Sequence, residues 1–257
     1  MKSDLQNGEV VYFLELGRET VEVNQLLGRT VKLTYQGRIN CVVCGKETKK
    51  SFGQGFCYHC FTTAPEADEC ILRPERCRAH LGISRDMEWS HDHCLQPHIV
   101  YLAVSGGLKV GVTRESQIPY RWIDQGAARA MPLCRTPNRH VAGVIESFLM
   151  ARFGDKTNWK KMISNTDMSH FDLASERRKA LSFLPLELRQ YETKDPAEFH
   201  TTYPVLTWPE KPAQVNLDKE NTINAGLKGI RGQYLIFDDQ SVFNVRRFSG
   251  YYVEMFS

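Results

Sequence analysis

The sequence predicts an α+β protein with a cysteine-rich segment, and three observations support this fold class. Seven of the eight cysteines fall between Cys41 and Cys94, so they form one local group. Short apolar or alternating runs near both ends of the chain are typical of β-strands. Between residues 98 and 190, a β-hairpin pattern precedes several helix patterns, which predicts a small α/β core.

Composition shifts along the chain predict five segments. They are N-terminal strands at 1–40, a metal-binding segment at 41–97, a small α/β core at 98–190, a proline-rich connector at 191–216 and C-terminal hairpins at 217–257. We expect the N- and C-terminal strands to pair into one small sheet or barrel, because chain ends often lie close together.

The individual elements follow from residue patterns. Turns are expected at Gly28, Gly37 and the Gly106–Gly107 pair, because glycine permits tight turns. We expect strands at 10–14, 30–37, 99–104, 108–112, 233–237, 242–245 and 251–256, and helices at 118–125, 142–153 and 173–184.

Charge and hydropathy narrow the location and the partners. The net charge is +3, so any nucleic-acid binding must come from local clusters of charge. The first residues lack the apolar segment of a signal peptide, and no run approaches the roughly 18 apolar residues of a membrane span. We therefore expect a cytoplasmic protein with no membrane contact.

The first cysteine group has the spacing of a structural zinc site. Its ligands would be the pairs Cys41/Cys44 and Cys57/Cys60, separated by twelve residues as in a zinc ribbon. Disulfides or free thiols are the alternatives, but disulfides are rare in a reducing compartment. Four cysteine ligands would make this site closed and structural, with residues 51–56 as a hairpin tip between the pairs.

A second group has looser spacing. We expect Cys70, Cys77, His80 and Cys94 to hold a second zinc ion, with His91 or His93 as alternatives to His80. The other interpretation is that these residues are surface histidines and ordinary thiols. Cys134 has no partner at metal-site spacing and is expected to act as a small apolar residue.

The core after the cysteines resembles the GIY-YIG endonuclease superfamily. The resemblance rests on Tyr101 in the first strand, Lys109-Val-Gly111 in the second strand, and then Arg121, Glu146 and Asn158 in the family's order. It covers about sixty residues. It implies a short three-stranded sheet with flanking helices.

The resemblance also implies a phosphodiesterase site. Glu146 would bind Mg²⁺ or Mn²⁺, Arg121 would stabilise the developing charge, and Tyr101 or a neighbour would deprotonate water. Lys109 stands where the family has its second tyrosine, so it would act either as a base with a lowered pKa or as a cation on phosphate. Arg121 also lies two residues further from Gly111 than the family pattern predicts.

The whole chain also resembles an uncharacterised bacterial family with a domain of unknown function, which implies no activity. The matching stretches are 41–46, 51–57, 62–67, 122–127, 155–159 and 228–234.

A basic stretch indicates nucleic acid as a partner. Residues 109–179 contain thirteen Lys and Arg against seven Asp and Glu. We expect nucleic-acid contacts from basic and aromatic side chains of this stretch, namely Arg114, Trp122, Arg139, Lys156, Trp159 and Lys160. The alternative is a solvated helix face.

Two functions follow from these patterns. The first is a zinc-stabilised nucleic-acid-binding protein with a GIY-YIG-like core and metal-dependent phosphodiesterase activity. The second is a non-enzymatic zinc-containing module that binds RNA or protein, which Lys109 favours. Redox or metal sensing through Cys57 and Cys60 is a third option, but four cysteines would bind zinc and mask the thiolates.

Overall fold

The structure is a computed structural model that describes residues 1–154, 157–166, 171–194 and 196–257. The chain divides into two compact units. Unit 1 contains Met1–Thr62, Ile163–Asn165 and Thr201–Ser257, and unit 2 contains Thr63–Met162 and Thr166–His200.

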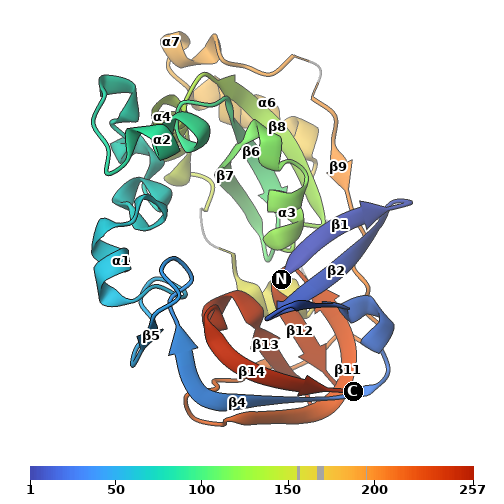
Figure 1. Cartoon of the computed structure of the whole chain (residues 1–257). Helices are drawn as coiled ribbons and strands as arrows, with labels where there is room; N and C mark the ends of the chain where they lie inside the picture. The colour runs from blue at the N-terminus through green and yellow to red at the C-terminus, as the bar shows by residue number, and fades with distance from the viewer. Residues whose placement is uncertain (155–156, 167–170, 195) are drawn as a thin grey trace. The chain divides into compact units, whose positions relative to one another are not determined.

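Unit 1 begins with a three-stranded antiparallel sheet (Figure 1). Its strands are β1 (Lys2–Gln6), β2 (Glu9–Leu16) and β3 (Glu19–Glu22). In β2, buried Val10, Tyr12 and Leu14 alternate with more exposed residues, as the period of a half-buried strand requires. The predicted strand at 10–14 is confirmed.

The second sheet of unit 1 joins strands from distant parts of the sequence. Its order is β10-β13-β12-β11-β4-β14, and β5 also pairs with β4. The strands are β4 (Thr30–Asn40), β5 (Glu47–Thr48), β10 (Ala213–Gln214), β11 (Thr222–Arg231), β12 (Tyr234–Phe237), β13 (Ser241–Asn244) and β14 (Tyr251–Phe256).

Strand β4 pairs with both β11 and β14, so a strand that follows the N-terminal sheet joins strands near the C-terminus (Figure 1). Among the described residues, β4 is the one strand from the first forty residues in this sheet. Gly37 does not end the strand, which corrects the expected turn. It lies inside β4 with φ of 74°, where the pairing with β14 shifts register. Glycine suits such a bulge because it has no Cβ.

Unit 2 contains a four-stranded antiparallel sheet in the order β7-β6-β8-β9. The strands are β6 (His98–Val104), β7 (Leu108–Arg114), β8 (Arg129–Thr136) and β9 (Phe199–His200). The predicted hairpin around Gly106 and Gly107 is confirmed. Strand β8 was not expected. Its Pro132 lies beside Tyr101 at a register shift, a place where a strand tolerates proline.

The described helices are α1 (Tyr58–Thr63), α2 (Met87–His93), α3 (Tyr120–Asp124), α4 (Arg139–Met150), α5 (Trp159–Ile163), α6 (Leu173–Phe183) and α7 (Leu186–Arg189). Residues of α3, α4 and α6 pack against the sheet of unit 2. Short 3-10 helices lie at Val23–Leu26, Pro65–Ala67, Glu69–Ile71, Pro74–Arg76, Ala79–Leu81, Glu115–Gln117 and Val245–Phe248. The three predicted helices correspond to α3, α4 and α6.

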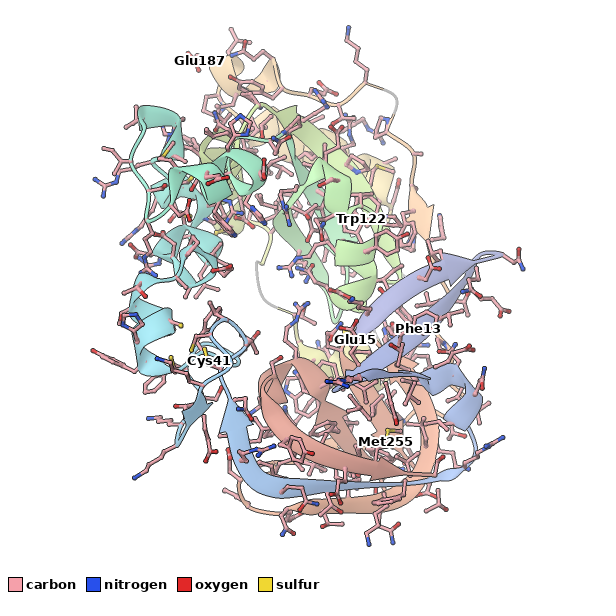
Figure 2. The ribbon with its side chains drawn as sticks, viewed as in Figure 1. Phe13, Glu15, Cys41, Trp122, Glu187 and Met255 are labelled. Atoms are coloured by element: carbon pink, nitrogen blue, oxygen red, sulfur yellow. The ribbon has the colours of Figure 1, made fainter. Side chains whose placement is uncertain are left out.

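The two faces of the sheet in unit 2 bury different residues. On one face, Leu102 of β6 packs with Ile145 and Leu149 of α4. On the other face, Tyr101 packs with Trp122 of α3, which Figure 2 labels. Alternation along β6 therefore separates an aliphatic core from the face that holds Tyr101. None of the described helices is long and apolar enough to cross a membrane.

Candidate functional sites

Unit 1 contains a cluster of four cysteines. One ligand atom each from Cys41, Cys44, Cys57 and Cys60 lies within 4.8 Å of the others, and Figure 2 shows sulfur atoms gathered near Cys41. The Sγ atoms of Cys44 and Cys57 are 3.9 Å apart. Four thiols that converge this closely match the donor set of a tetrahedral zinc site. The cluster can therefore hold a metal ion.

Backbone groups prepare this cluster for a cation. Burial would raise the pKa of the Cys41 thiol, but hydrogen bonds from backbone N–H groups of Cys44, Cys57 and Val43 outweigh it and lower the pKa to about 6. A thiol with a lowered pKa supplies a thiolate ligand readily. Burial raises the pKa of Cys60 to about 12, so Cys60 loses its proton only when a cation replaces it.

The two cysteine pairs sit on different local structures. Cys41 and Cys44 lie in a tight turn after β4, in which the N–H of Gly45 donates to the carbonyl of Cys41. Cys57 precedes α1, and Cys60 lies inside that helix. The two cysteine pairs are thus presented by one turn and one helix start. The hairpin tip is present, since Phe52 and Phe56 exchange backbone hydrogen bonds of 2.9 Å.

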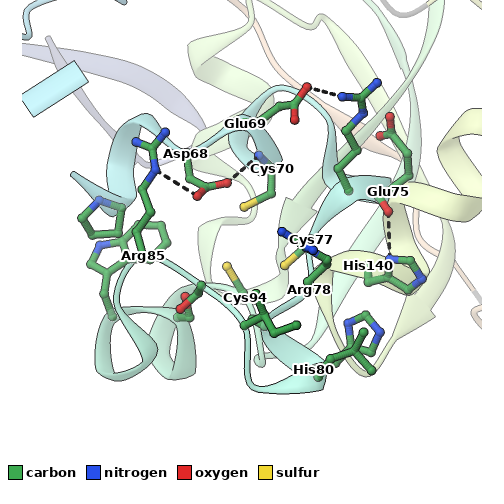
Figure 3. Close-up of a pocket in the computed structure, with 18 residues that line it drawn as sticks. Asp68, Glu69, Cys70, Glu75, Cys77, Arg78, His80, Arg85, Cys94 and His140 are labelled. Atoms are coloured by element: carbon green, nitrogen blue, oxygen red, sulfur yellow. Dashed lines mark hydrogen bonds and ion pairs between the residues drawn. The ribbon is translucent and has the colours of Figure 1, made fainter. Parts of the chain in front are cut away.

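Unit 2 contains a second cluster of three cysteines. The Sγ atoms of Cys70, Cys77 and Cys94 lie within 4.8 Å of one another, and Figure 3 shows them pointing toward a common space. The three side chains are buried. Hydrogen bonds from the neighbouring thiols of Cys70 and Cys94 lower the pKa of Cys77 to about 2. This cluster can also hold a metal ion, with Cys77 as the first thiolate.

The histidines expected near this cluster have other contacts. The ring of His80 stacks on that of His140 with centroids 4.4 Å apart, and Figure 3 shows it directed away from the sulfurs. His91 pairs with Asp92, and His93 stacks on Trp89. No histidine or carboxylate of the described residues joins the three-cysteine group. The structure thus corrects the expected role of His80.

The eighth cysteine belongs to the core. Cys134 lies in β8, is fully buried and packs among Val100, Leu133 and their neighbours. Burial raises the pKa of its thiol to about 12, so Cys134 stays protonated. Its expected role as a small apolar residue agrees with this packing.

Tyr101 occupies a tight polar site in the middle of the sheet. Its side chain is fully buried, and its hydroxyl donates a 2.8 Å hydrogen bond to Oε1 of Gln125. Burial raises the pKa of Tyr101 to about 12. The charge and hydrogen bond of Arg121 lower this pKa, and the charge of Glu146 raises it. Tyr101 therefore keeps its proton at neutral pH, which corrects its expected role as a base.

Gly111 makes room for this tyrosine. It pairs with Tyr101 across the β6–β7 ladder, and a Cβ at Gly111 would lie 2.7 Å from the Tyr101 hydroxyl oxygen. The glycine of the second motif thus has a steric explanation in this chain. Any side chain there would displace Tyr101.

Lys109 and Asn158 have structural partners. Lys109 is 4% exposed, and its ammonium donates a 2.7 Å hydrogen bond to Oγ1 of Thr157. The Asn158 side chain accepts a hydrogen bond from the N–H of Lys161 at the start of α5. Glu146 is partly exposed on α4. The charges of Arg121 and Glu146 both act on Tyr101. Lys109 and Asn158 instead hold the Thr157–Lys161 segment in place.

Three arginines line one pocket of about 230 Å³. They are Arg114 of β7, Arg121 of α3 and Arg139 of α4. No carboxylate of the described residues lines this pocket. Burial and the nearby charge of Arg139 lower the pKa of Arg114, so Arg114 and Arg139 repel each other. An anion in the pocket would relieve that repulsion.

A buried histidine faces the same pocket. His98 is 1% exposed, and its Nδ1 lies 2.7 Å from the carbonyl oxygen of Gln96. That contact assigns the proton to Nδ1 and leaves Nε2 as an acceptor, which has no hydrogen-bond partner among the described residues. Burial is the main cause that lowers the pKa of His98 to about 4. The sequence pattern did not predict that His98 lines the pocket with the three arginines, because these residues come from different elements.

The residues expected to touch nucleic acid lie in different places. Arg114 and Arg139 line the arginine pocket, whereas Trp122 is 3% exposed and packs against Tyr101 and Phe199. This burial does not fit the expected contact of Trp122 with nucleic acid. Trp159 and Lys160 lie at the start of α5, with the ammonium of Lys160 5.7 Å from the Trp159 ring. Lys156 lies outside the described residues.

Sequence comparison identifies the family of this chain. A family model described as a protein of unknown function, DUF2797, matches residues 28–253. Neither a curated protein nor a solved structure matches the chain.

Proposed function

Because this chain belongs to the DUF2797 family, whose function is unknown, we propose a function from its residues: a zinc-stabilised protein that binds nucleic acid through the arginine pocket. One observation supports this proposal most strongly. Arg114, Arg121 and Arg139 line one pocket without a carboxylate among its described lining residues. Guanidinium groups pair with phosphate oxygens through two parallel hydrogen bonds, so a phosphate backbone is the anion that suits this pocket.

Zinc would stabilise the segments that hold the pocket. Arg139 donates hydrogen bonds to the backbone carbonyls of Cys70 and His93, at 3.3 and 3.2 Å. Its guanidinium thus links α4 to two parts of the segment that contains the three-cysteine cluster. A metal ion bound by those cysteines would fix both carbonyls and so orient Arg139 toward the pocket.

We also propose a GIY-YIG-like phosphodiesterase activity, from the order of three residues around the sheet. Tyr101 lies on the middle strand, Arg121 on the helix after the hairpin and Glu146 on a later helix, in the order of that superfamily. A divalent ion at Glu146 would supply a Lewis acid and an activated water. Arg121 would stabilise charge on the phosphate. Protonated Tyr101 would position Arg121 through the interaction of its hydroxyl with that guanidinium.

The binding proposal is tested by the salt dependence of affinity. Fluorescence anisotropy with labelled single-stranded RNA, single-stranded DNA and duplex DNA would be measured for the wild type and for Arg114→Gln. We expect Arg114→Gln to weaken binding and to lower the slope of log K against log salt by about 0.7–0.9, because one phosphate contact is lost.

Arg152→Gln is the matched control for this titration. Arg152 is exposed, stacks on the Phe183 ring at 4.1 Å and lies outside the arginine pocket. It should bind as the wild type does. Equal slopes for the wild type and Arg114→Gln, or salt-independent binding, would contradict the proposal. A salt-independent partner would instead favour a protein-binding module.

The catalytic part needs a separate assay. Cleavage of the same oligonucleotides would be followed in Mg²⁺ and in Mn²⁺, with Glu146→Ala as the variant. We expect cleavage by the wild type and its loss in Glu146→Ala, while both proteins bind with similar affinity. Equal cleavage by both would reject Glu146 as the metal ligand, and binding without cleavage would leave the non-enzymatic alternative.

A further inference from the structure

We propose that the three-cysteine cluster of unit 2 is an open zinc site, whose fourth position is taken by an exchangeable ligand and binds an external thiol. This inference does not depend on nucleic-acid binding. It concerns the cavity into which the three sulfurs open, and the ligand that completes the metal coordination there.

The cluster supplies only three ligands among the described residues. Zinc takes four ligands in proteins, and sites with three protein ligands bind water or substrate at the fourth position. Cys70, Cys77 and Cys94 converge within 4.8 Å, and the described residues add no fourth histidine, cysteine or carboxylate to this group. In contrast, the cluster of unit 1 supplies four cysteines and is closed.

The three cysteines open into a cavity. All three cysteines line a cavity of about 830 Å³, which is within the range of small-molecule sites. Its lining also includes Asp68, Arg85 and Trp89. A ligand that enters this cavity reaches the sulfurs directly, so a metal ion held by them would be accessible from it.

The cavity wall near the cluster is held in place. Asp68 accepts a 3.0 Å hydrogen bond from the N–H of Cys70, and its other oxygen pairs with Arg85 at 3.2 Å (Figure 3). Arg85 also donates to the carbonyl of Ala64. The carboxylate of Asp68 is therefore engaged in support of Cys70, as expected of a group that orients a ligand. The carboxylate of Glu69, adjacent to Cys70, pairs with Arg76.

Charge determines which external donor is suitable. Three thiolates on Zn²⁺ leave one net negative charge, and a fourth thiolate would add another. Arg139 would offset part of this charge, because its guanidinium lies beside the cluster and donates to the backbone carbonyls of Cys70 and His93. A thiol is a soft donor that matches zinc already bound by sulfur. On binding, the thiol would displace the exchangeable ligand from the fourth position, release its proton to solvent and coordinate as a thiolate.

Cobalt substitution tests the open position directly. The full-length protein would be loaded with two Co²⁺ per chain and titrated with 2-mercaptoethanol, followed by the visible ligand-field bands and the sulfur-to-cobalt charge-transfer band. We expect a saturable increase in charge-transfer absorbance from one site per chain. The closed site of unit 1 has no free position and contributes a constant background.

His80 provides the deciding comparison. If the fourth position is open, the wild type and His80→Ala respond equally to the thiol, and Cys77→Ser removes the response. If His80 is the fourth ligand in solution, the wild type does not respond and His80→Ala gains a response, which would overturn the proposal. Binding of one Co²⁺ per chain, or a wild type that does not respond to the thiol, would also overturn it. Circular dichroism confirms that each variant is folded.

Discussion

At the residue scale, the Tyr101–Gly111 pair shows that a weak sequence motif can have a firm steric basis. Alanine at position 111 would place its Cβ 2.7 Å from the Tyr101 hydroxyl oxygen, and that hydroxyl is fixed by Gln125. Alanine normally stabilises a strand relative to glycine by about 0.5–1 kcal/mol. Overpacking costs about 1–3 kcal/mol, so the steric effect should dominate.

We therefore predict that Gly111→Ala lowers the free energy of unfolding by about 1–2 kcal/mol, measured by urea denaturation. Gly154→Ala is the control, because a Cβ there has no atom within 4 Å. If both variants are equally stable, the proposed contact between Gly111 and Tyr101 does not constrain the sheet.

His98 gives a prediction about pH. Its pKa falls from 6.5 to about 4 on folding, mainly through burial. As the pH falls, His98 is therefore protonated in the unfolded chain before it is protonated in the folded chain. Stability that depends on neutral His98 is fully present above pH 6.5 and declines as the pH falls toward 4, by about 1.4 kcal/mol per pH unit at most.

His98→Gln should flatten this part of the stability curve. The measurement is chemical denaturation at several pH values with saturating zinc, so that metal loss affects both proteins alike. Parallel curves for the wild type and His98→Gln would show that His98 does not contribute to the acid sensitivity.

At the scale of elements, α4 connects the sheet of unit 2 to the segment with the three-cysteine cluster. Gly143 lies on the buried face of α4, where a Cβ would lie 2.1 Å from the backbone nitrogen of Glu75. The Nδ1 atom of His140, one turn earlier, lies 2.9 Å from the carbonyl oxygen of Glu75. The 3-10 helix Pro74–Arg76 thus packs directly on the helix backbone.

Gly143→Ala should therefore be destabilising, although alanine inside a helix normally adds about 1 kcal/mol of stability over glycine. We predict a loss of at least about 2 kcal/mol, because backbone atoms of Pro74 and Glu75 must move. Thermal unfolding of Gly143→Ala and of the control Gly154→Ala measures this. A melting temperature above that of the wild type would contradict the packing.

Elements with regular periodicity could be predicted from the sequence, and irregular ones could not. The patterns that predict the hairpin β6–β7 and the helices α4 and α6 are local, so the sequence contains them. Strand β8 escaped prediction because Pro132 and flanking arginines interrupt its apolar run, and pairing with β6 compensates for this. Gly37 was misjudged for a similar reason, since a bulge inside a strand and a turn favour the same residue.

The candidate sites were likewise predicted only in part from the sequence. Cysteine spacing identified both clusters, because metal ligands must be close in the chain or converge at fixed positions. The sequence could not show that His80 stacks on His140, or that Arg114, Arg121 and Arg139 line one pocket, because these contacts join distant elements. Burial of Trp122 likewise depends on its contact with Tyr101.

At the scale of the whole molecule, metal should stabilise two separate regions. The three-cysteine cluster packs with Ala79, Trp89 and Leu95 as a small core of its own. This core is too small to be stable without a cross-link such as a bound metal ion. We predict that a strong chelator accelerates hydrogen exchange in residues 41–62 and 69–94 and leaves β11 and β12 protected. Added zinc should restore protection. Unchanged exchange in both segments would exclude a structural role for the metal.

The most direct test of the account is the zinc content of the purified chain, measured by mass spectrometry of the metal against protein concentration. The central claim is that the two cysteine clusters each hold one zinc ion. It predicts two zinc ions per chain in the wild type, one in Cys41→Ser/Cys44→Ser and one in Cys70→Ser/Cys77→Ser. A wild type without zinc, or a content that neither double substitution lowers, would contradict it.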